Sequence, residues 1–159
     1  MVTFNKSGID CIERFEGLCR GAGIRVTPQR VAVYKVLVNS TDHPSANSVY
    51  QQVRQDIRNI SFDTVNRTLA TLSEIGAAFI VEGSGDVKRF DGNLENHQHF
   101  KCIKCKKIID FHHEPFNNIK LPKSVEGQFT VLRKTVLLEG LCRTCQPMTG
   151  DKRKNEANL

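Results

Sequence analysis

Metal-binding side chains are concentrated between residues 91 and 110 of this 159-residue chain. In chain order the segment holds Asp91, His97, His99, Cys102, Cys105 and Asp110. On an extended strand His97 and His99 point to the same face, because side chains alternate with a period of two. Cys102 stands an odd number of residues beyond His99 and opens a CxxC turn, which directs its sulfur toward a different ion. The segment therefore predicts two separate metal sites.

Two CxxC pairs, Cys102/Cys105 and Cys142/Cys145, predict a structural zinc site. Four thiolates close a tetrahedron around zinc and leave no coordination position open. The long interval between the pairs predicts an inserted helix, from Pro115 to Glu126. The alternative is that each CxxC pair is a redox dithiol, although one shared ion explains two pairs in one short domain more economically.

Nitrogen and oxygen donors without sulfur define the second predicted site, which consists of His97, His99, Asp91 and Asp110. This donor set suits iron(II), manganese(II) or zinc, and geometry rather than raw affinity would select among them. His112 and His113 are interpreted as structural or solvated, which is the usual state of a histidine outside a ligand cluster.

The composition describes an ordinary globular protein with a local basic surface. Hydrophobic residues make up 39% and charged residues 25% of the chain, which excludes collagen-like, low-complexity and wholly disordered classes. No apolar run approaches the roughly 20 residues that cross a bilayer, so a cytoplasmic protein is expected. The net charge of +6 favours polyanionic partners, and residues 17–41 contain basic side chains but no acid. Cys11 and Cys19 lie about 12 Å apart along one predicted helix, too far for a disulfide, and are expected in the core.

The N-terminal half has the pattern of a winged helix. Helical apolar spacing predicts four helices: residues 10–20, a helix capped by Thr27 and begun by Pro28, a helix capped by Ser45, and residues 62–76. Two short apolar runs between residues 77 and 91, on either side of Gly83-Ser84-Gly85, predict a β-hairpin. The last three of these helices, followed by a two-stranded ribbon, have the order of elements in a winged helix.

A winged helix inserts its last helix into the major groove of DNA, where asparagine and arginine read adenine and guanine edges. The last predicted helix offers Thr64, Asn66 and Arg67, of which Asn66 and Arg67 are the candidates for base reading. Arg25 and Arg30 are candidates for phosphate contacts, since no acid lies within one helical turn of either in sequence. Two alternatives stay open: Arg67 is an ordinary solvated arginine, or the winged helix serves protein interaction.

The motifs of the chain resemble those of the ferric uptake regulator (Fur) superfamily over residues 10 to 146. They are VTPQR (26–30), DHPSANSVY (42–50), DTVNRTLATLSEIG (63–76), RFD (89–91), HQHFKCIKC (97–105), IIDF (108–111) and GLCRTC (140–145). The resemblance implies a homodimeric, metal-activated transcriptional repressor that is not an enzyme. It implies an α+β fold with a winged-helix DNA-binding domain over residues 1–88 and an α/β metal-binding and dimerisation domain over residues 89–146. A flexible polar tail is expected over residues 147–159.

Asp91 and Asp110 make the chain resemble the peroxide-sensing PerR branch of this superfamily, since iron-sensing members usually carry glutamates at both positions. The resemblance also supplies a fifth ligand, His43, so one iron or manganese ion would join the DNA-binding half, through His43, to four donors in the other half. It implies that peroxide oxidises His43 or His97, and that manganese gives a less responsive form. Rival interpretations are a ferric or zinc uptake repressor of the same superfamily, a thiol oxidoreductase, and a zinc-ribbon protein that binds RNA or another protein.

Three positions depart from the family pattern. Asn66 replaces the tyrosine that most relatives carry on the last helix, so the operator preference is expected to differ. Arg133 and Lys134 stand where many relatives carry histidine, so the additional metal site of some members is expected to be absent.

The basic residues at 152–154 of the tail are expected to be solvated.

Overall fold

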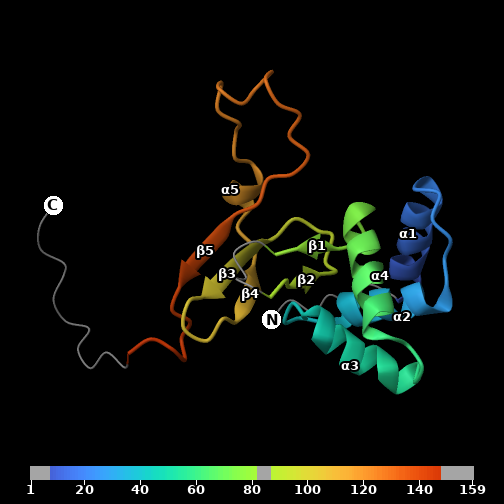
Figure 1. Ribbon diagram of the computed structural model, residues 1–159. Helices are drawn as coiled ribbons and strands as arrows, with labels where there is room; N and C mark the ends of the chain where they lie inside the picture. The colour runs from blue at the N-terminus through green and yellow to red at the C-terminus, as the bar shows by residue number, and fades with distance from the viewer. Residues whose placement is uncertain (1–7, 82–86, 148–159) are drawn as a thin grey trace, which may run out of the picture. The chain divides into compact units, whose positions relative to one another are not determined.

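The computed structural model describes residues 8–81 and 87–147, with side chains from Cys11 onward (Figure 1). The chain divides into two units, which separate between Asn96 and His97. The sequence predicts the boundary earlier, between residues 88 and 89. The expected hairpin turn at Gly83-Ser84-Gly85 and the tail beyond Pro147 lie outside the described residues.

The described part of the first unit is mainly helical, with α1 (Gly8–Gly21), α2 (Pro28–Asn39), α3 (Ala46–Asp56) and α4 (Phe62–Glu74). The predicted caps are confirmed, because the side chains of Thr27 and Ser45 accept hydrogen bonds from backbone N–H groups of the first helical turn. Ser61 caps α4 in the same way. Gly76, with a φ of +71°, follows α4 as its predicted stop. Within the described residues, every helix is too short or too polar to cross a membrane.

The core of the first unit lies where these helices meet. Phe15 of α1 stacks on Tyr34 of α2, with ring centroids 4.6 Å apart. Other fully buried apolar side chains come from α2, α3 and α4, namely Val33, Leu37, Val49, Val53, Val65, Leu69 and Leu72. Cys19 is buried in this core, as predicted, and Cys11 packs against it. Burial of one apolar face of α4 leaves its polar face in water.

A two-stranded ribbon completes the first unit. Strand β1 (Phe79–Ile80) pairs antiparallel with β2 (Phe90–Asp91), as the predicted hairpin requires. Gly92 follows β2, and a Cβ atom at this position would lie only 2.8 Å from the carbonyl carbon of Leu37 in α2. Glycine therefore permits the chain after β2 to approach the helix backbone closely. The order of helices and ribbon confirms the winged helix.

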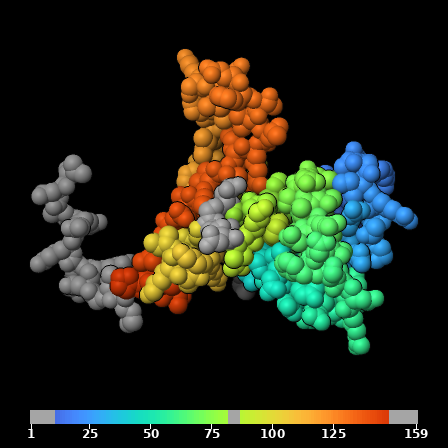
Figure 2. Space-filling model, in the orientation of Figure 1, coloured from blue at the N-terminus to red at the C-terminus, as the bar shows by residue number. Residues whose placement is uncertain are grey.

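The second unit is built on a three-stranded sheet with the order β4-β3-β5 (Figure 1). Its strands are β3 (Gln98–Cys102), β4 (Ile108–Phe111) and β5 (Leu137–Gly140). The central strand β3 runs antiparallel to β4 and parallel to β5. A single helical turn, α5 (Glu114–Asn117), follows β4, and residues 118–136 then form a lobe that projects from the sheet (Figure 2).

The helix predicted from Pro115 to Glu126 is wrong, because only the single turn α5 forms. Pro122 lies inside the predicted span, has no N–H group to donate, and disfavours the helical conformation of Leu121. The carbonyl of Pro122 instead accepts a hydrogen bond from the N–H of Glu126, and Gly127 follows with a φ of +77°. Turns rather than a helix therefore fill the interval between the two cysteine pairs.

Candidate metal centres and nucleic-acid interface

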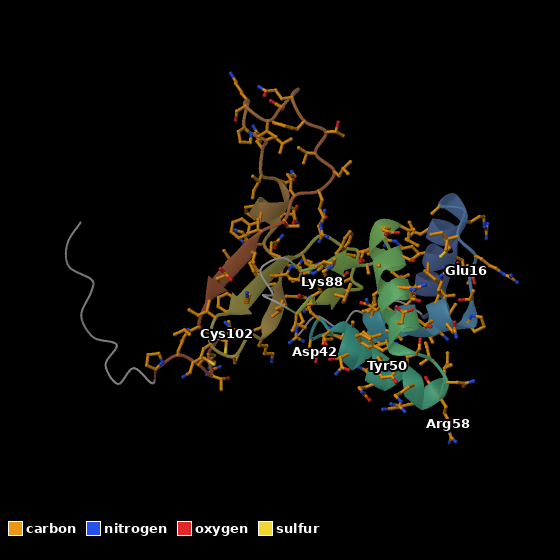
Figure 3. All side chains as sticks on the ribbon, in the orientation of Figure 1. Glu16, Asp42, Tyr50, Arg58, Lys88 and Cys102 are labelled. Atoms are coloured by element: carbon orange, nitrogen blue, oxygen red, sulfur yellow. The ribbon has the colours of Figure 1, made fainter. Side chains whose placement is uncertain are left out.

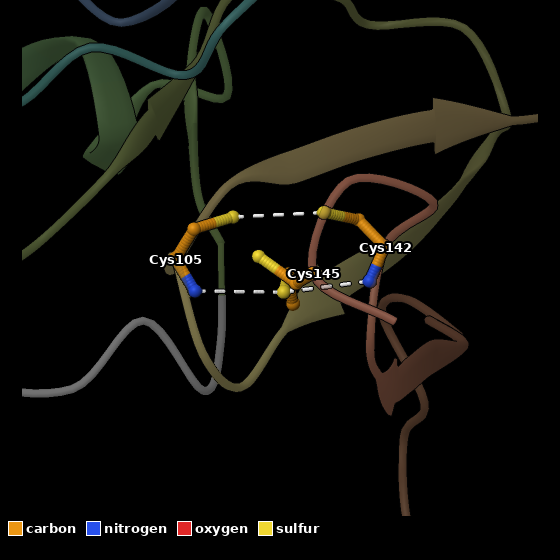
Figure 4. Close-up of side chains that lie close together, drawn as sticks. Cys105, Cys142 and Cys145 are labelled. Carbon is orange, nitrogen blue, oxygen red and sulfur yellow. Dashed lines mark hydrogen bonds between the residues drawn. The ribbon is translucent and has the colours of Figure 1, made fainter. Parts of the chain in front are cut away.

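Four cysteine sulfurs converge at one end of the sheet in the second unit (Figure 4). Cys102 ends β3, and Cys142 follows β5 after one intervening residue. The Sγ atoms of Cys105 and Cys142 lie 3.7 Å apart, and the four sulfurs all lie within 4.8 Å of one another. Parallel pairing ends β3 and β5 at the same edge, so the two distant CxxC turns meet.

Backbone hydrogen bonds and burial have opposite effects on the acidities of these thiols. The N–H groups of Cys142 and Cys105 donate to Cys102 Sγ at 3.4 and 3.5 Å, and they lower the pKa of the Cys102 thiol to about 6. Burial, together with the neighbouring sulfurs, raises the pKa of Cys145 to about 12. A divalent cation stabilises thiolates that neighbouring sulfurs would otherwise keep protonated. The cluster fits a structural zinc site.

Histidine nitrogens and a carboxylate gather on the other half of β3 and its neighbour β4. The Nε2 atoms of His97 and His99 lie 3.0 Å apart, as the two-residue spacing on a strand predicts. His99 stands directly opposite Asp110 in the antiparallel register. The nearest oxygen of Asp110 lies 3.5 Å from His99 Nε2 and 3.8 Å from His97 Nε2. These three side chains present nitrogen and oxygen donors together.

Two further candidate ligands lie in the first unit, where β2 holds both. His43 is buried in the loop between α2 and α3, with a left-handed φ of +51° immediately before Pro44. The N–H of Phe90 donates to the Pro44 carbonyl at 3.1 Å, and the Arg89 guanidinium donates to the His43 carbonyl at 3.4 Å. A backbone conformation with positive φ is thus secured by bonds from Phe90 of β2 and from Arg89 just before it.

Asp91 lies in the first of the two units, whereas the sequence boundary between residues 88 and 89 groups it with the second. Asp91 is the last residue of β2 and stands opposite Phe79 in the ribbon. Its Oδ1 accepts a hydrogen bond of 2.8 Å from the N–H of Asn93, which fixes the carboxylate orientation. Two candidate donors therefore come from the winged-helix unit and three, including Asp110, from the sheet unit.

Gln98 is a buried polar residue that sequence reasoning missed. It lies between His97 and His99 and, by strand alternation, on the opposite face of β3. Its Oε1 accepts from the N–H of His113 at 2.8 Å, and its Nε2 donates to Asn117 Oδ1 at 2.6 Å. These bonds tie the ligand-bearing strand to the chain that follows β4. The signal in the sequence was the amide itself, placed between two residues already assigned to a metal.

The remaining polar residues of this region are exposed and have contacts of their own. His112 and His113 are exposed, and the His113 ring packs edge-on against Phe116 at 4.7 Å. Lys134 donates to the carbonyl of Ile119 at 2.9 Å, so its ammonium group secures the base of the projecting lobe. These contacts give His113 and Lys134 structural roles.

The outward face of α4 presents the predicted base-reading residues. Asn66 and Arg67 are exposed, and Arg67 Nε donates to Asp63 Oδ2 at 2.9 Å. Thr64 is half-buried, and its hydroxyl lies 2.8 Å from the Ser61 hydroxyl at the helix cap. The structure therefore leaves Asn66 and Arg67 available to a partner, whereas Thr64 is engaged in capping.

Basic side chains also occur at the start of α2 and before α4. Arg25 is exposed, and the guanidinium of the half-buried Arg30 donates to the Arg25 carbonyl, which links the two residues at the start of α2. Arg58 extends from the turn between α3 and α4 (Figure 3), a position that sequence reasoning did not single out. Arg58 stands three residues before the Ser61 cap, so it precedes the helix that carries Asn66 and Arg67.

Known proteins resemble this chain in sequence and in fold. The peroxide-responsive repressor PerR of Staphylococcus aureus is 36% identical over 127 residues, which cover 80% of this chain and 86% of that protein. The structure of the Helicobacter pylori ferric uptake regulator Fur matches with a TM-score of 0.69 at 25% identity, over 89% of this chain and 95% of that one. That structure is described as revealing three functional metal binding sites. The structure of GAS PerR-Zn-Zn matches with a TM-score of 0.50 at 26% identity, over 87% and 92% of the two chains.

The family model described as the ferric uptake regulator family matches residues 21–138. The match runs from the end of α1 into β5 and includes the ribbon, His97 and His99, and the first cysteine pair. It thus spans most of the winged helix and most of the sheet unit. This chain belongs to the ferric uptake regulator family.

Proposed function

We propose that this protein is a metal-dependent transcriptional repressor that binds operator DNA as a homodimer and releases it in response to peroxide. The observation that carries the proposal is the division of nitrogen and oxygen donors between the two units. His43 and Asp91 are held by the winged helix, whereas His97, His99 and Asp110 are held by the sheet. A ligand set divided in this way makes metal binding depend on the arrangement of the DNA-binding unit. Such a repressor acts where the chromosome is, in the cytoplasm.

The proposed regulatory ligands are three imidazoles and two carboxylates. Nitrogen and oxygen donors without sulfur suit iron(II) or manganese(II), whereas the four-sulfur cluster suits zinc. These five side chains would hold the ion, and an iron(II) ion there would supply reactivity toward peroxide. The aspartates at 91 and 110 and the 36% identity to PerR of Staphylococcus aureus support peroxide over other signals.

The proposed repression follows from the positions of the donors. When His43 and Asp91 bind the same ion as the three donors of the sheet unit, the winged helix takes one orientation relative to the dimerisation unit. In a two-fold dimer this orientation sets the separation of the two α4 helices, which must match two operator half-sites. A divalent ion also adds two positive charges, which favours a polyanionic partner. Coupling energies of about 1–3 kcal/mol correspond to roughly 5- to 150-fold in affinity, enough for a repressor.

The proposed response to peroxide acts on the ligands. An iron(II) ion, if held by these five side chains, would supply the redox chemistry by which peroxide transfers one oxygen atom to a neighbouring imidazole and leaves as water. Oxidation of His43 or His97 then removes a nitrogen donor, and the remaining four donors hold the units together less tightly. Manganese(II) is harder to oxidise, so a manganese-loaded protein is expected to stay on DNA.

The test is a DNA-binding titration of the full-length, zinc-replete protein with iron(II) or manganese(II), before and after a low dose of peroxide. Duplexes recovered by selection from a random library serve as probes, and mass spectrometry locates added oxygen. The expected result is metal-dependent binding, with loss of binding and one added oxygen on His43 or His97 only in the iron-loaded protein. Metal-independent binding would contradict the repressor mechanism.

Iron-uptake regulation is the second candidate, and the resemblance to Helicobacter pylori Fur favours it. The same titration separates the two functions. A ferric uptake repressor would require iron(II) and would keep its DNA after a peroxide dose, without added oxygen on a ligand. In that case DNA regulation stands and the peroxide response does not.

A further inference from the structure

The exposed face of α4 carries more acid than base. Its outward side chains in the described structure are Phe62, Asp63, Asn66, Arg67, Ala70 and Glu74. Asp63 and Glu74 contribute two negative charges against the single positive charge of Arg67. A helix that enters the major groove close to two rows of phosphates would bind more tightly without these acids. The presence of Asp63 on this face therefore calls for a role other than phosphate attraction.

The geometry supplies that role. Asp63 Oδ2 accepts from Arg67 Nε at 2.9 Å, one helical turn apart, with both side chains largely in solvent. This contact occupies the inner nitrogen of the guanidinium and leaves the two terminal amino groups to donate elsewhere. Guanine presents two adjacent acceptors, O6 and N7, in the major groove, and arginine binds them with two parallel hydrogen bonds. An arginine held at Nε is already oriented for this pairing.

We propose that Asp63 is a specificity-determining residue, which orients Arg67 to read a guanine in each operator half-site. This inference rests on the proposed function, since it assigns base preference to the same DNA-binding surface. Asp63 acts in two ways. It restricts the guanidinium to a pose that matches O6 and N7, and its own charge weakens binding to duplexes that lack the guanine.

The ion pair is too exposed to be explained by stability. Arg67 and Asp63 side chains are 80% and 67% accessible, and exposed pairs at this spacing contribute little to folding. Asp63→Asn is therefore expected to fold normally while it frees the guanidinium. Glu74→Gln is the matched control, because it removes the same charge from the same exposed face but lies about 10 Å along the helix from Arg67.

The experiment uses the full-length, zinc-replete, manganese-loaded protein. Duplexes are selected from a random library with the wild type, and binding of the selected duplex is compared with versions in which each guanine is replaced. We expect one guanine per half-site whose replacement weakens wild-type binding by about 10-fold or more. Asp63→Asn is expected to reduce that discrimination to about 2-fold and to bind unselected duplex more tightly. Arg67→Lys is expected to abolish the preference, and Glu74→Gln to keep it.

The outcomes separate this inference from the proposed function. Unchanged guanine discrimination in Asp63→Asn, or an equal loss of discrimination in Glu74→Gln, would overturn the role of Asp63 while metal-dependent DNA binding stands. A wild-type protein that binds no duplex with or without manganese would overturn the proposed function and the role of Asp63 with it. Melting temperatures of the three variants confirm that all are folded.

Discussion

The two candidate metal centres differ in which units supply their ligands. The four cysteines lie on two turns at one edge of one sheet, so folding of the second unit is sufficient to bring them together. The nitrogen and oxygen donors are divided between the units, with His43 and Asp91 on one side of the boundary. A site contained in one unit stabilises that unit. Under the proposed function, a divided set would link metal binding to domain orientation, which is what a sensor requires.

The largest expected effect is the loss of the sulfur cluster. Cys142→Ser removes one thiolate, and structural zinc in small sites binds with roughly 10–16 kcal/mol. We expect loss of zinc and a lower melting temperature of the second unit, measured by metal analysis and circular dichroism. Cys11→Ser, which changes a cysteine outside the cluster, should keep its zinc. A zinc-free Cys142→Ser protein with the melting temperature of the wild type would remove the distinction between a structural and a regulatory centre.

A smaller but selective effect on DNA binding is expected from loss of one of the five proposed nitrogen and oxygen ligands. His97→Ala should keep the zinc and the melting temperature of the protein but weaken manganese-dependent DNA binding by about 100-fold. His112→Ala is the matched control, since this histidine is close in sequence, exposed, and outside the proposed ligand set. DNA binding by titration and zinc content by mass spectrometry are the measurements. Tight, metal-independent binding by His97→Ala would contradict the proposed division of roles.

Gly92→Ala tests whether the first unit must position Asp91. The added Cβ would lie 2.8 Å from the Leu37 backbone, so the chain after β2 must move. Overpacking of this kind costs about 1–3 kcal/mol, and we expect lower thermal stability and weaker manganese binding with unchanged zinc content. Gly17→Ala, in a position with open space, should be neutral or slightly stabilising. Wild-type manganese affinity in Gly92→Ala would show that the position of Asp91 tolerates this shift.

The smallest expected effect is a titration within the zinc-free protein. Because backbone N–H groups lower the pKa of Cys102 to about 6, its thiolate should appear near that pH in the absorbance at 240 nm. A thiol whose folded pKa is depressed contributes stability above its unfolded pKa, and this contribution is lost as the pH falls through about 6. Cys102→Ser should lack this transition. A first transition above pH 8 would show that the turns alone do not prepare the cluster for metal.

Local features of the fold were predictable because local chemistry determines them. Thr27 and Ser45 cap helices because each places a side-chain hydroxyl just before a run of helically spaced apolar residues. The two-residue spacing of His97 and His99 places both rings on one side of an extended chain. The pairing of the two CxxC turns was predictable for a chemical reason, since four thiolates complete one tetrahedron.

Features that depend on distant parts of the chain were not predictable in this way. The unit to which Asp91 belongs depends on strand pairing with Phe79, and the need for Gly92 depends on the approach of α2. His43 carries no local signal of its role, and only the family resemblance indicated it. The helix expected after Pro115 failed for a local reason, because the effect of Pro122 on helix continuation was overlooked.

The hydrogen bonds of the Gln98 side-chain amide also favour the correct pairing register of strand β3. A strand that slips by one residue exchanges its two faces, and a slip of β3 would turn both imidazoles away from Asp110. The same slip would break the bonds from Gln98 to His113 and Asn117 and leave a buried amide unsatisfied. Sheets with the wrong register are therefore less stable even without a metal ion, so the candidate ligands on β3 and β4 are aligned before metal binds.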